Sequence, residues 1–189
     1  MAAPHGVPRP VLVVAVALAA LLAVGVAALG VLTSGGGDAP APGPSPQQEA
    51  ARQSPLALPD EPAPQAGSAD CSALLGGMPQ QLVVHGAPVP RRPLAQRVPA
   101  ALAWGDAQHD PVVARCGIDR PAELQRTSQL TDVSGVEWLQ RPAGASTTWI
   151  VVDRTVRAAL TVPNDAGTGP LQDVSEVVAR TLPKRPVFG

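Results

Sequence analysis

Aromatic residues and lysines are scarce in this chain. Phe, Trp and Tyr make up 2% of the 189 residues, tyrosine is absent, and Lys184 is the only lysine. Proteins that bind nucleic acids need clustered cations and aromatic rings on which bases stack, whereas this chain has a formal net charge of −1. The composition therefore argues against a nucleic-acid partner.

Familiar catalytic motifs are also missing. The sequence contains no G-x-S-x-G, no H-E-x-x-H, no glycine-rich phosphate loop and no S-x-x-K. We therefore expect a module that binds a ligand or a protein partner, without a cofactor. An enzyme that acts on cell-wall material, with a site outside the known motifs, is the alternative.

One long segment lacks charge altogether. The apolar run from Val11 to Leu32 would reach roughly 33 Å as a helix, enough to cross a hydrocarbon core of about 30 Å. The apolar part of a cleavable signal peptide is shorter, about 7–15 residues, which favours a retained transmembrane helix over residues 11–33. Cleavage near Ala28-Leu29-Gly30 is the alternative.

The charges beside this segment predict its orientation. Arg9 and the terminal amine precede it, and Asp38 is the first charge after it. Because positive charge favours the cytoplasmic side, residues 1–10 should be cytoplasmic and everything after Thr33 extracytoplasmic. We therefore expect a single-pass protein of the cell membrane, with the lipid bilayer as one partner and cell-wall material or an envelope protein as another.

Residues 34–69 are rich in Pro, Ala, Gly, Gln and Ser. Such a segment buries too little apolar surface to offset its conformational entropy, which predicts a disordered linker. The linker would separate the membrane helix from one folded domain over residues 70–189. A proline-rich ligand for a partner module is the alternative, although no basic residue accompanies a repeated P-x-x-P unit.

Cys71 and Cys116 are the only cysteines. Both lie on the side of the membrane predicted to be oxidising, and an even number there favours a disulfide. The alternatives are a metal site, which needs further ligands at short spacing, and a reactive thiol, which needs a nearby base.

Hydrophobic spacing predicts an α+β fold, with a small antiparallel sheet and an N-terminal and a C-terminal helix packed on one face. Leucines and Met78 recur at helical spacing between Cys71 and Leu82. A longer apolar stripe from Leu171 to Leu182 has Pro170 at its start and Pro183 after its end, as expected of a helix.

Two hairpins are expected between these helices. Residues 99–104 and 111–118 flank the turn-rich stretch 105–110. Residues 147–152 and 155–162 flank Asp153-Arg154, and alternation in the later strand predicts one solvated face. A further strand through residues 136–138 follows a turn at Ser134-Gly135. In the strand 111–118, the apolar face carries Val112, Ala114, Cys116 and Ile118, and Arg115 lies on the other face.

Several of these segments together resemble a known family. They are Trp104-Gly105-Asp106, residues 111–117, residues 135–139 and residues 151–163. The chain resembles, over roughly residues 71–182, an actinobacterial family of single-anchor extracytoplasmic proteins of unknown function. This resemblance implies a cell-envelope protein with a disulfide, and no established activity.

Arg115 and Trp104 are two of the three predicted binding residues. The guanidinium of Arg115 suits a carboxylate or phosphate, and a surface ion pair is the alternative. Trp104, Trp138 and Trp149 could form a platform for a ligand, or they could be the large side chains of the core.

Asp106 is the third predicted binding residue. Asp106, His109 and Asp110 have metal-ligand chemistry, but they lie on a turn, where such residues favour turn conformations and a loop without further fixed ligands makes a poor metal site. We therefore expect no metal here.

Overall fold

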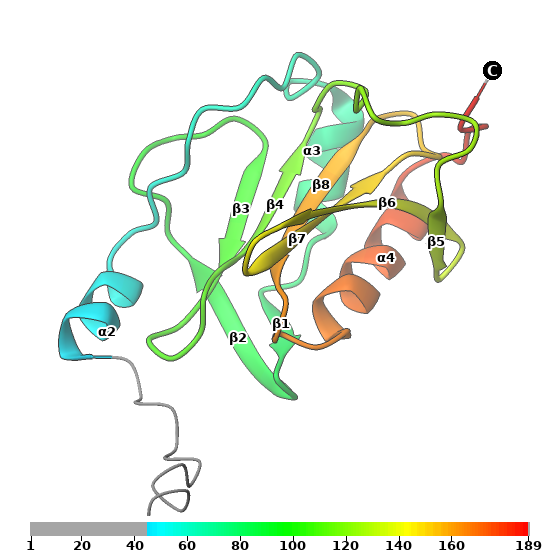
Figure 1. Ribbon diagram of the computed structural model, residues 1–189. Coiled ribbons are helices and arrows are strands. Elements are labelled where there is room, and N and C mark those ends of the chain that lie inside the picture. The colour runs from blue at the N-terminus through cyan, green and yellow to red at the C-terminus, as the bar shows by residue number, and fades with distance from the viewer. Residues whose placement is uncertain (1–44, 189) are drawn as a thin grey trace, which may run out of the picture. The chain divides into compact units, whose positions relative to one another are not determined.

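The computed structural model describes residues 45–188; the predicted cytoplasmic N-terminus, the membrane helix and the first part of the linker lie outside this range. Within residues 45–188, no helix is long and apolar enough to cross a membrane. The described chain forms a curled antiparallel sheet of eight strands, with three helices (Figure 1).

The strands lie in the spatial order β1-β2-β3-β4-β8-β7-β6-β5. Their bounds are β1 (Gln81–Val84), β2 (Ala87–Arg92), β3 (Ala101–Trp104), β4 (Val112–Cys116), β5 (Leu130–Val133), β6 (Val136–Ala143), β7 (Ser146–Val151) and β8 (Ala158–Pro163). β8 pairs with both β4 and β7, so this last strand joins the meander β1–β4 to the meander β5–β7.

The helices are α2 (Pro46–Gln53), α3 (Ala69–Gly77) and α4 (Gly169–Thr181). α3 and α4 pack against each other, and α4 also packs against β1, β5, β6 and β8. Ser68 caps α3 by accepting a hydrogen bond from the backbone N–H of Cys71 at 3.2 Å, and Pro170 occupies the first turn of α4.

Different hydrophobic clusters lie on the two faces of the sheet. The larger cluster combines α3 and α4 with one face and contains Trp104 and Trp138, both 0% exposed. Trp138 Nε1 donates a hydrogen bond to Ser175 Oγ of α4 at 3.0 Å, which satisfies the one polar group of the buried indole. The smaller cluster consists of Ile118, Leu124, Leu139, Ile150, Val152 and Ala159.

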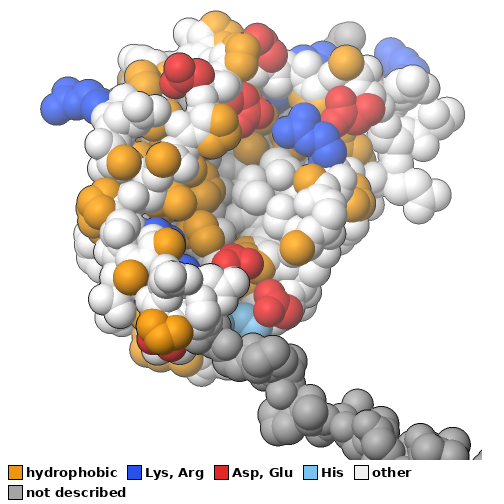
Figure 2. All heavy atoms as spheres, turned by 60° about the vertical axis from the view of Figure 1, so that its left-hand side comes forward, with side chains coloured by type: hydrophobic (Ala, Val, Ile, Leu, Met, Phe, Trp, Pro, Cys, Tyr) orange, Lys and Arg blue, Asp and Glu red, His pale blue; other side chains and the backbone are white. Residues whose placement is uncertain are grey.

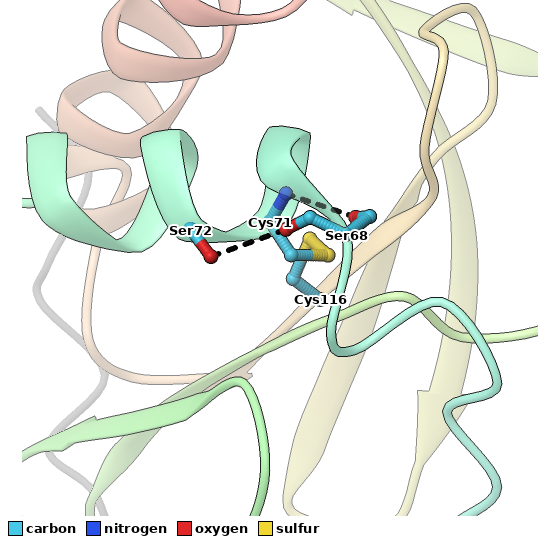
Figure 3. Close-up of a disulfide and its surroundings, with 4 residues drawn as sticks. All are labelled: Ser68, Cys71, Ser72 and Cys116. Atoms are coloured by element: carbon cyan, nitrogen blue, oxygen red, sulfur yellow. Dashed lines mark hydrogen bonds between the residues drawn. A yellow bond between two sulfur atoms is a disulfide. The ribbon is translucent and has the colours of Figure 1, made fainter.

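The disulfide between Cys71 and Cys116 joins the first turn of α3 to the end of β4 (Figure 3). The two Cα atoms are 5.6 Å apart, and both residues are 0% exposed. The prediction of an antiparallel sheet with helices and one disulfide is therefore confirmed.

Some local predictions are wrong for identifiable reasons. Ile118 belongs to the smaller cluster rather than to the face of Cys116, because Gly117 has a φ of +85° and turns the chain between them. The hairpin expected around Asp153-Arg154 exists, but its connection is longer than these two residues, because β7 ends at Val151 and β8 begins at Ala158; Asp153 and Arg154 are 1% and 8% exposed and bind each other. The expected solvated face of β8 is only partly exposed, since Ala159 is 5% exposed and Thr161 is half-buried.

The second half of the predicted linker also differs from the prediction. From Ser45 onward it contains α2, whose N-terminus has a capping box formed by Ser45 and Gln48. Beyond α2, Leu56 forms a parallel bridge with Leu94, and Leu58 is 7% exposed. Packing against the sheet therefore orders a segment whose composition alone favours disorder.

Candidate functional site

Two segments lie over the sheet face that points away from α3 and α4. One is the segment over residues 54–67, which is extended before a turn at residues 64–67 and which we call the strap. The other is the irregular segment over residues 118–129, which contributes Ile118 and Leu124 to the smaller cluster. Arg115, Ala159 and Ile150 are successive neighbours across β4, β8 and β7 on this face, so the predicted residue Arg115 lies beneath these segments.

A pocket of about 280 Å³ lies between the strap and residues 118–129, and we call it the charged pocket. Ile118 and Ile150 give it an apolar floor. Its ionisable lining residues are Glu61, Asp119, Arg120, Glu123 and Arg141. Seen from the side of α2, the surface is hollowed, and acidic and basic side chains lie together beside hydrophobic ones (Figure 2).

Arg141 stands between two carboxylates in the charged pocket. One Nη atom lies 3.8 Å from Glu61 Oε1, and the other lies 3.8 Å from Glu123 Oε1. All three side chains are 39–46% exposed, and ion pairs of this kind contribute only about 0–1 kcal/mol. A ligand with both an acidic and a basic group could therefore replace these partners at little cost.

The guanidinium of Arg115 is not free to bind an anion, and it is too buried to be a surface ion pair. Arg115 is 9% exposed, its Nη2 donates to the carbonyl of Pro59 at 2.6 Å, and its Nε lies 3.4 Å from Glu61 Oε2. The strap therefore occupies the guanidinium that we predicted would bind an anion, and Glu61 links Arg115 to Arg141.

Trp104 belongs to the core and not to a ligand platform. Its Nε1 donates to the carbonyl of Pro79 at 3.1 Å, and the guanidinium of Arg91 lies 4.9 Å from its ring centroid. Trp149 is only partly buried and packs against the larger cluster, so the three tryptophans do not form one exposed surface.

Asp106 organises the loop between β3 and β4. Its carboxylate accepts hydrogen bonds from the backbone N–H groups of Gln108 and His109, and His109 Nδ1 lies 2.9 Å from it. Burial raises the pKa of Asp106, but these hydrogen bonds outweigh burial, so the pKa lies below its ordinary value. The His109 ring stacks on His85 with centroids 4.5 Å apart.

Among residues 45–188, no group of three or more His, Cys, Asp or Glu side chains is placed to hold a metal ion. Asp110 instead pairs with Arg52 of α2 at 2.8 Å, so α2 is held against the β3–β4 loop.

Sequence reasoning missed Glu61, Glu123 and Arg141. Glu61 lies in a segment predicted as linker, and Glu123 lies in an irregular segment without a motif. The position of Arg141 was predictable, because it is two residues after Leu139 and alternation along β6 places both on the face of Arg115.

The chain is similar to a group of proteins whose activity is not known. Its sequence matches the family described as a protein of unknown function, DUF3515, over residues 12–187. The chain belongs to the DUF3515 family. The match includes most of the apolar segment as well as the folded domain, so both are part of the DUF3515 sequence. No curated protein and no solved structure matches the chain.

Proposed function

We propose that this DUF3515 protein is a membrane-anchored, extracytoplasmic binding module of the cell envelope, and that its ligand occupies the charged pocket. The observation that carries this proposal is the placement of Arg141 between Glu61 and Glu123 over an apolar floor. Ligand pockets typically combine an apolar lining with a few polar groups that fix orientation.

The charges in the pocket favour a ligand with groups of both signs. Arg141 can bind a carboxylate through two parallel hydrogen bonds, whereas Glu61 and Glu123 can bind an ammonium group. A short aliphatic stem could lie against Ile118 and Ile150. Peptide fragments of cell-wall material, with amino and carboxyl groups on small aliphatic residues, have this chemistry.

The proposed location rests on the N-terminal sequence and the disulfide. The apolar run from Val11 to Leu32 is long enough for a membrane helix, and its flanking charges favour an external domain. The disulfide is typical of an oxidising compartment. A reporter enzyme that works only outside the cytoplasm, fused after Gly189, is expected to be active. Activity of a cytoplasm-specific reporter at the same place would contradict this location.

Substitution of Arg141 tests the pocket. Arg141→Ala is expected to weaken binding of the full chain to soluble cell-wall peptide fragments at least about tenfold, since a hydrogen bond to a charged group is worth about 1.5–3 kcal/mol. Stability should change by less than about 0.5 kcal/mol, because the side chain is 46% exposed. Binding can be measured by calorimetry, with Arg97→Ala as a control at an exposed arginine outside the pocket. Equal affinities of wild type and Arg141→Ala would contradict the proposed site.

The contact between Asp106 and His109 supports a second candidate, an enzyme acting on cell-wall material. A carboxylate that holds a histidine ring is the orienting part of a general base. On this alternative, His109→Asn would abolish turnover of cell-wall fragments and leave their binding at the charged pocket intact. Absence of turnover by the wild-type chain would remove the alternative.

A further inference from the structure

We propose that the strap is an internal peptide ligand, and that an extended, acidic, proline-containing segment of a partner protein competes with it for the same surface. This proposal deepens the proposed function, on which it rests, by naming a second kind of ligand for the same sheet face and a device that controls access to it. It follows from how the strap is held, from what lies beneath it, and from how little of it is buried.

The strap forms one parallel bridge with the segment that follows β2. The backbone N–H of Leu56 donates to the carbonyl of Pro93 at 2.8 Å, and the N–H of Ala95 donates to the carbonyl of Leu56 at 2.9 Å. Extended peptides that bind proteins use main-chain hydrogen bonds of this kind, with side-chain contacts for specificity.

Two buried arginines also bind carbonyl groups of the strap and of the end of α2. Arg92 and Arg115 flank β3 on one face of the sheet and are only 8% and 9% exposed. Arg92 donates to the carbonyls of Ser54 and Ala51 at 2.8–3.0 Å, and Arg115 donates to that of Pro59. If the strap left, Arg115 would lose the carbonyl of Pro59, and Arg92 would keep only the carbonyl of Ala51 in α2.

Among the described residues, the buried guanidinium of Arg92 lacks a negatively charged partner. Within residues 45–188 it pairs with no carboxylate, and burial together with the positive charge of Arg52 lowers its pKa. Its acceptors are the carbonyl oxygens of Ser54, at the start of the strap, and of Ala51 in α2, although a carboxylate would be a stronger partner for a guanidinium. An acidic peptide segment would therefore bind this surface better than the strap does at Arg92.

The strap buries little apolar surface along its length. Between residues 54 and 64 only Leu58 is buried, and Pro55, Pro59, Pro62 and Pro64 have no N–H to donate. Segments with few buried apolar contacts open at low free energy. The end of the strap is fixed instead: Gln65 N–H donates to the carbonyl of Gly117 at 3.1 Å, so its middle can open while it stays attached.

A competition experiment tests the proposal. A labelled peptide with the sequence of residues 54–67 is added to the full chain in detergent, either wild type or Leu58→Ala. The variant loses the strap's one buried side chain, which raises the fraction of open strap, so we expect it to bind the peptide at least about tenfold more tightly. Adding Arg92→Ala to this variant should abolish the gain, whereas adding Arg97→Ala should preserve it.

Each outcome decides the proposal. Equal affinity of wild type and Leu58→Ala, or binding unaffected by Arg92→Ala, would overturn it. Loss of binding when the peptide carries Asp60→Asn and Glu61→Gln supports acidic recognition, and unchanged binding rejects it. Displacement of the peptide by polyphosphate alone would show that the surface binds any anion. Concentration-dependent dimers of Leu58→Ala would show that the surface binds a second copy of the chain. The assay contains no cell-wall material, so its result does not depend on whether the charged pocket binds such material. The Arg141→Ala experiment tests that binding separately.

Discussion

Replacing both half-cystines, in the variant Cys71→Ala/Cys116→Ala, is expected to lower the free energy of unfolding by about 4 kcal/mol. The bond spans 45 residues of sequence, and a cross-link over a loop of this length removes much of the freedom of the unfolded chain. The double substitution leaves no free thiol. Urea denaturation followed by tryptophan fluorescence measures the effect as a shift of the midpoint.

Two controls accompany this measurement. Ser72→Ala changes an exposed residue of α3 next to the disulfide and should move the midpoint very little. Reduction of the wild-type chain should reproduce most of the loss. A double variant that unfolds at the wild-type urea concentration would show that the bond does not stabilise the domain.

The second large effect is expected at Asp153. The Asp153 carboxylate accepts a hydrogen bond from the backbone N–H of Glu137 at 3.1 Å and pairs with Arg154, which also donates to the carbonyl of Gly135 at 2.9 Å. Asp153→Asn keeps the shape of the side chain and removes its charge, which leaves Arg154 buried without a counter-ion. Breaking a buried ion pair in this way costs about 3–5 kcal/mol.

An exposed aspartate provides the matched control for Asp153→Asn. Asp60→Asn makes the same chemical change in the strap and should alter the free energy of unfolding by less than about 0.5 kcal/mol. Thermal and urea unfolding of both variants can be compared directly. Similar stability of Asp153→Asn and Asp60→Asn would mean that the buried pair is not needed for the fold.

The parts of the fold with regular spacing were predictable. Alternation defined the β3–β4 hairpin, and a stripe at helical period between Pro170 and Pro183 defined α4. Ser134-Gly135 forms the predicted turn between β5 and β6, with both residues at positive φ. In these segments local pattern and tertiary burial favour the same structure.

Other parts depend on contacts that a single sequence does not display. The pair Asp153-Arg154 has the polarity of an exposed turn, and only tertiary packing makes it a buried ion pair. β2 was missed because Pro88 and Pro90 argue against a strand. They are tolerated because only β1 pairs with β2 at these positions, and β3 pairs with β2 only at Arg91 and Arg92.

Only one element of the candidate site was visible in the sequence. Alternation in β4 predicted that Arg115 and Cys116 lie on opposite faces of the strand, and the register of β4 and β8 agrees with this. Its partners Pro59 and Glu61 come from a proline-rich segment about 55 residues earlier. Arg141 comes from another hairpin, so the charged pocket exists only once three distant segments meet.

Hydrogen exchange on the full chain tests most directly the claim that the sheet face away from α3 and α4 binds the ligand. Exchange is followed by mass spectrometry with and without soluble cell-wall peptide fragments. We expect slower exchange in residues 118–123 and at Arg141 and Ile150, with α3 and α4 unchanged. Slower exchange confined to α3 and α4, or no change anywhere in residues 45–188, would contradict the claim.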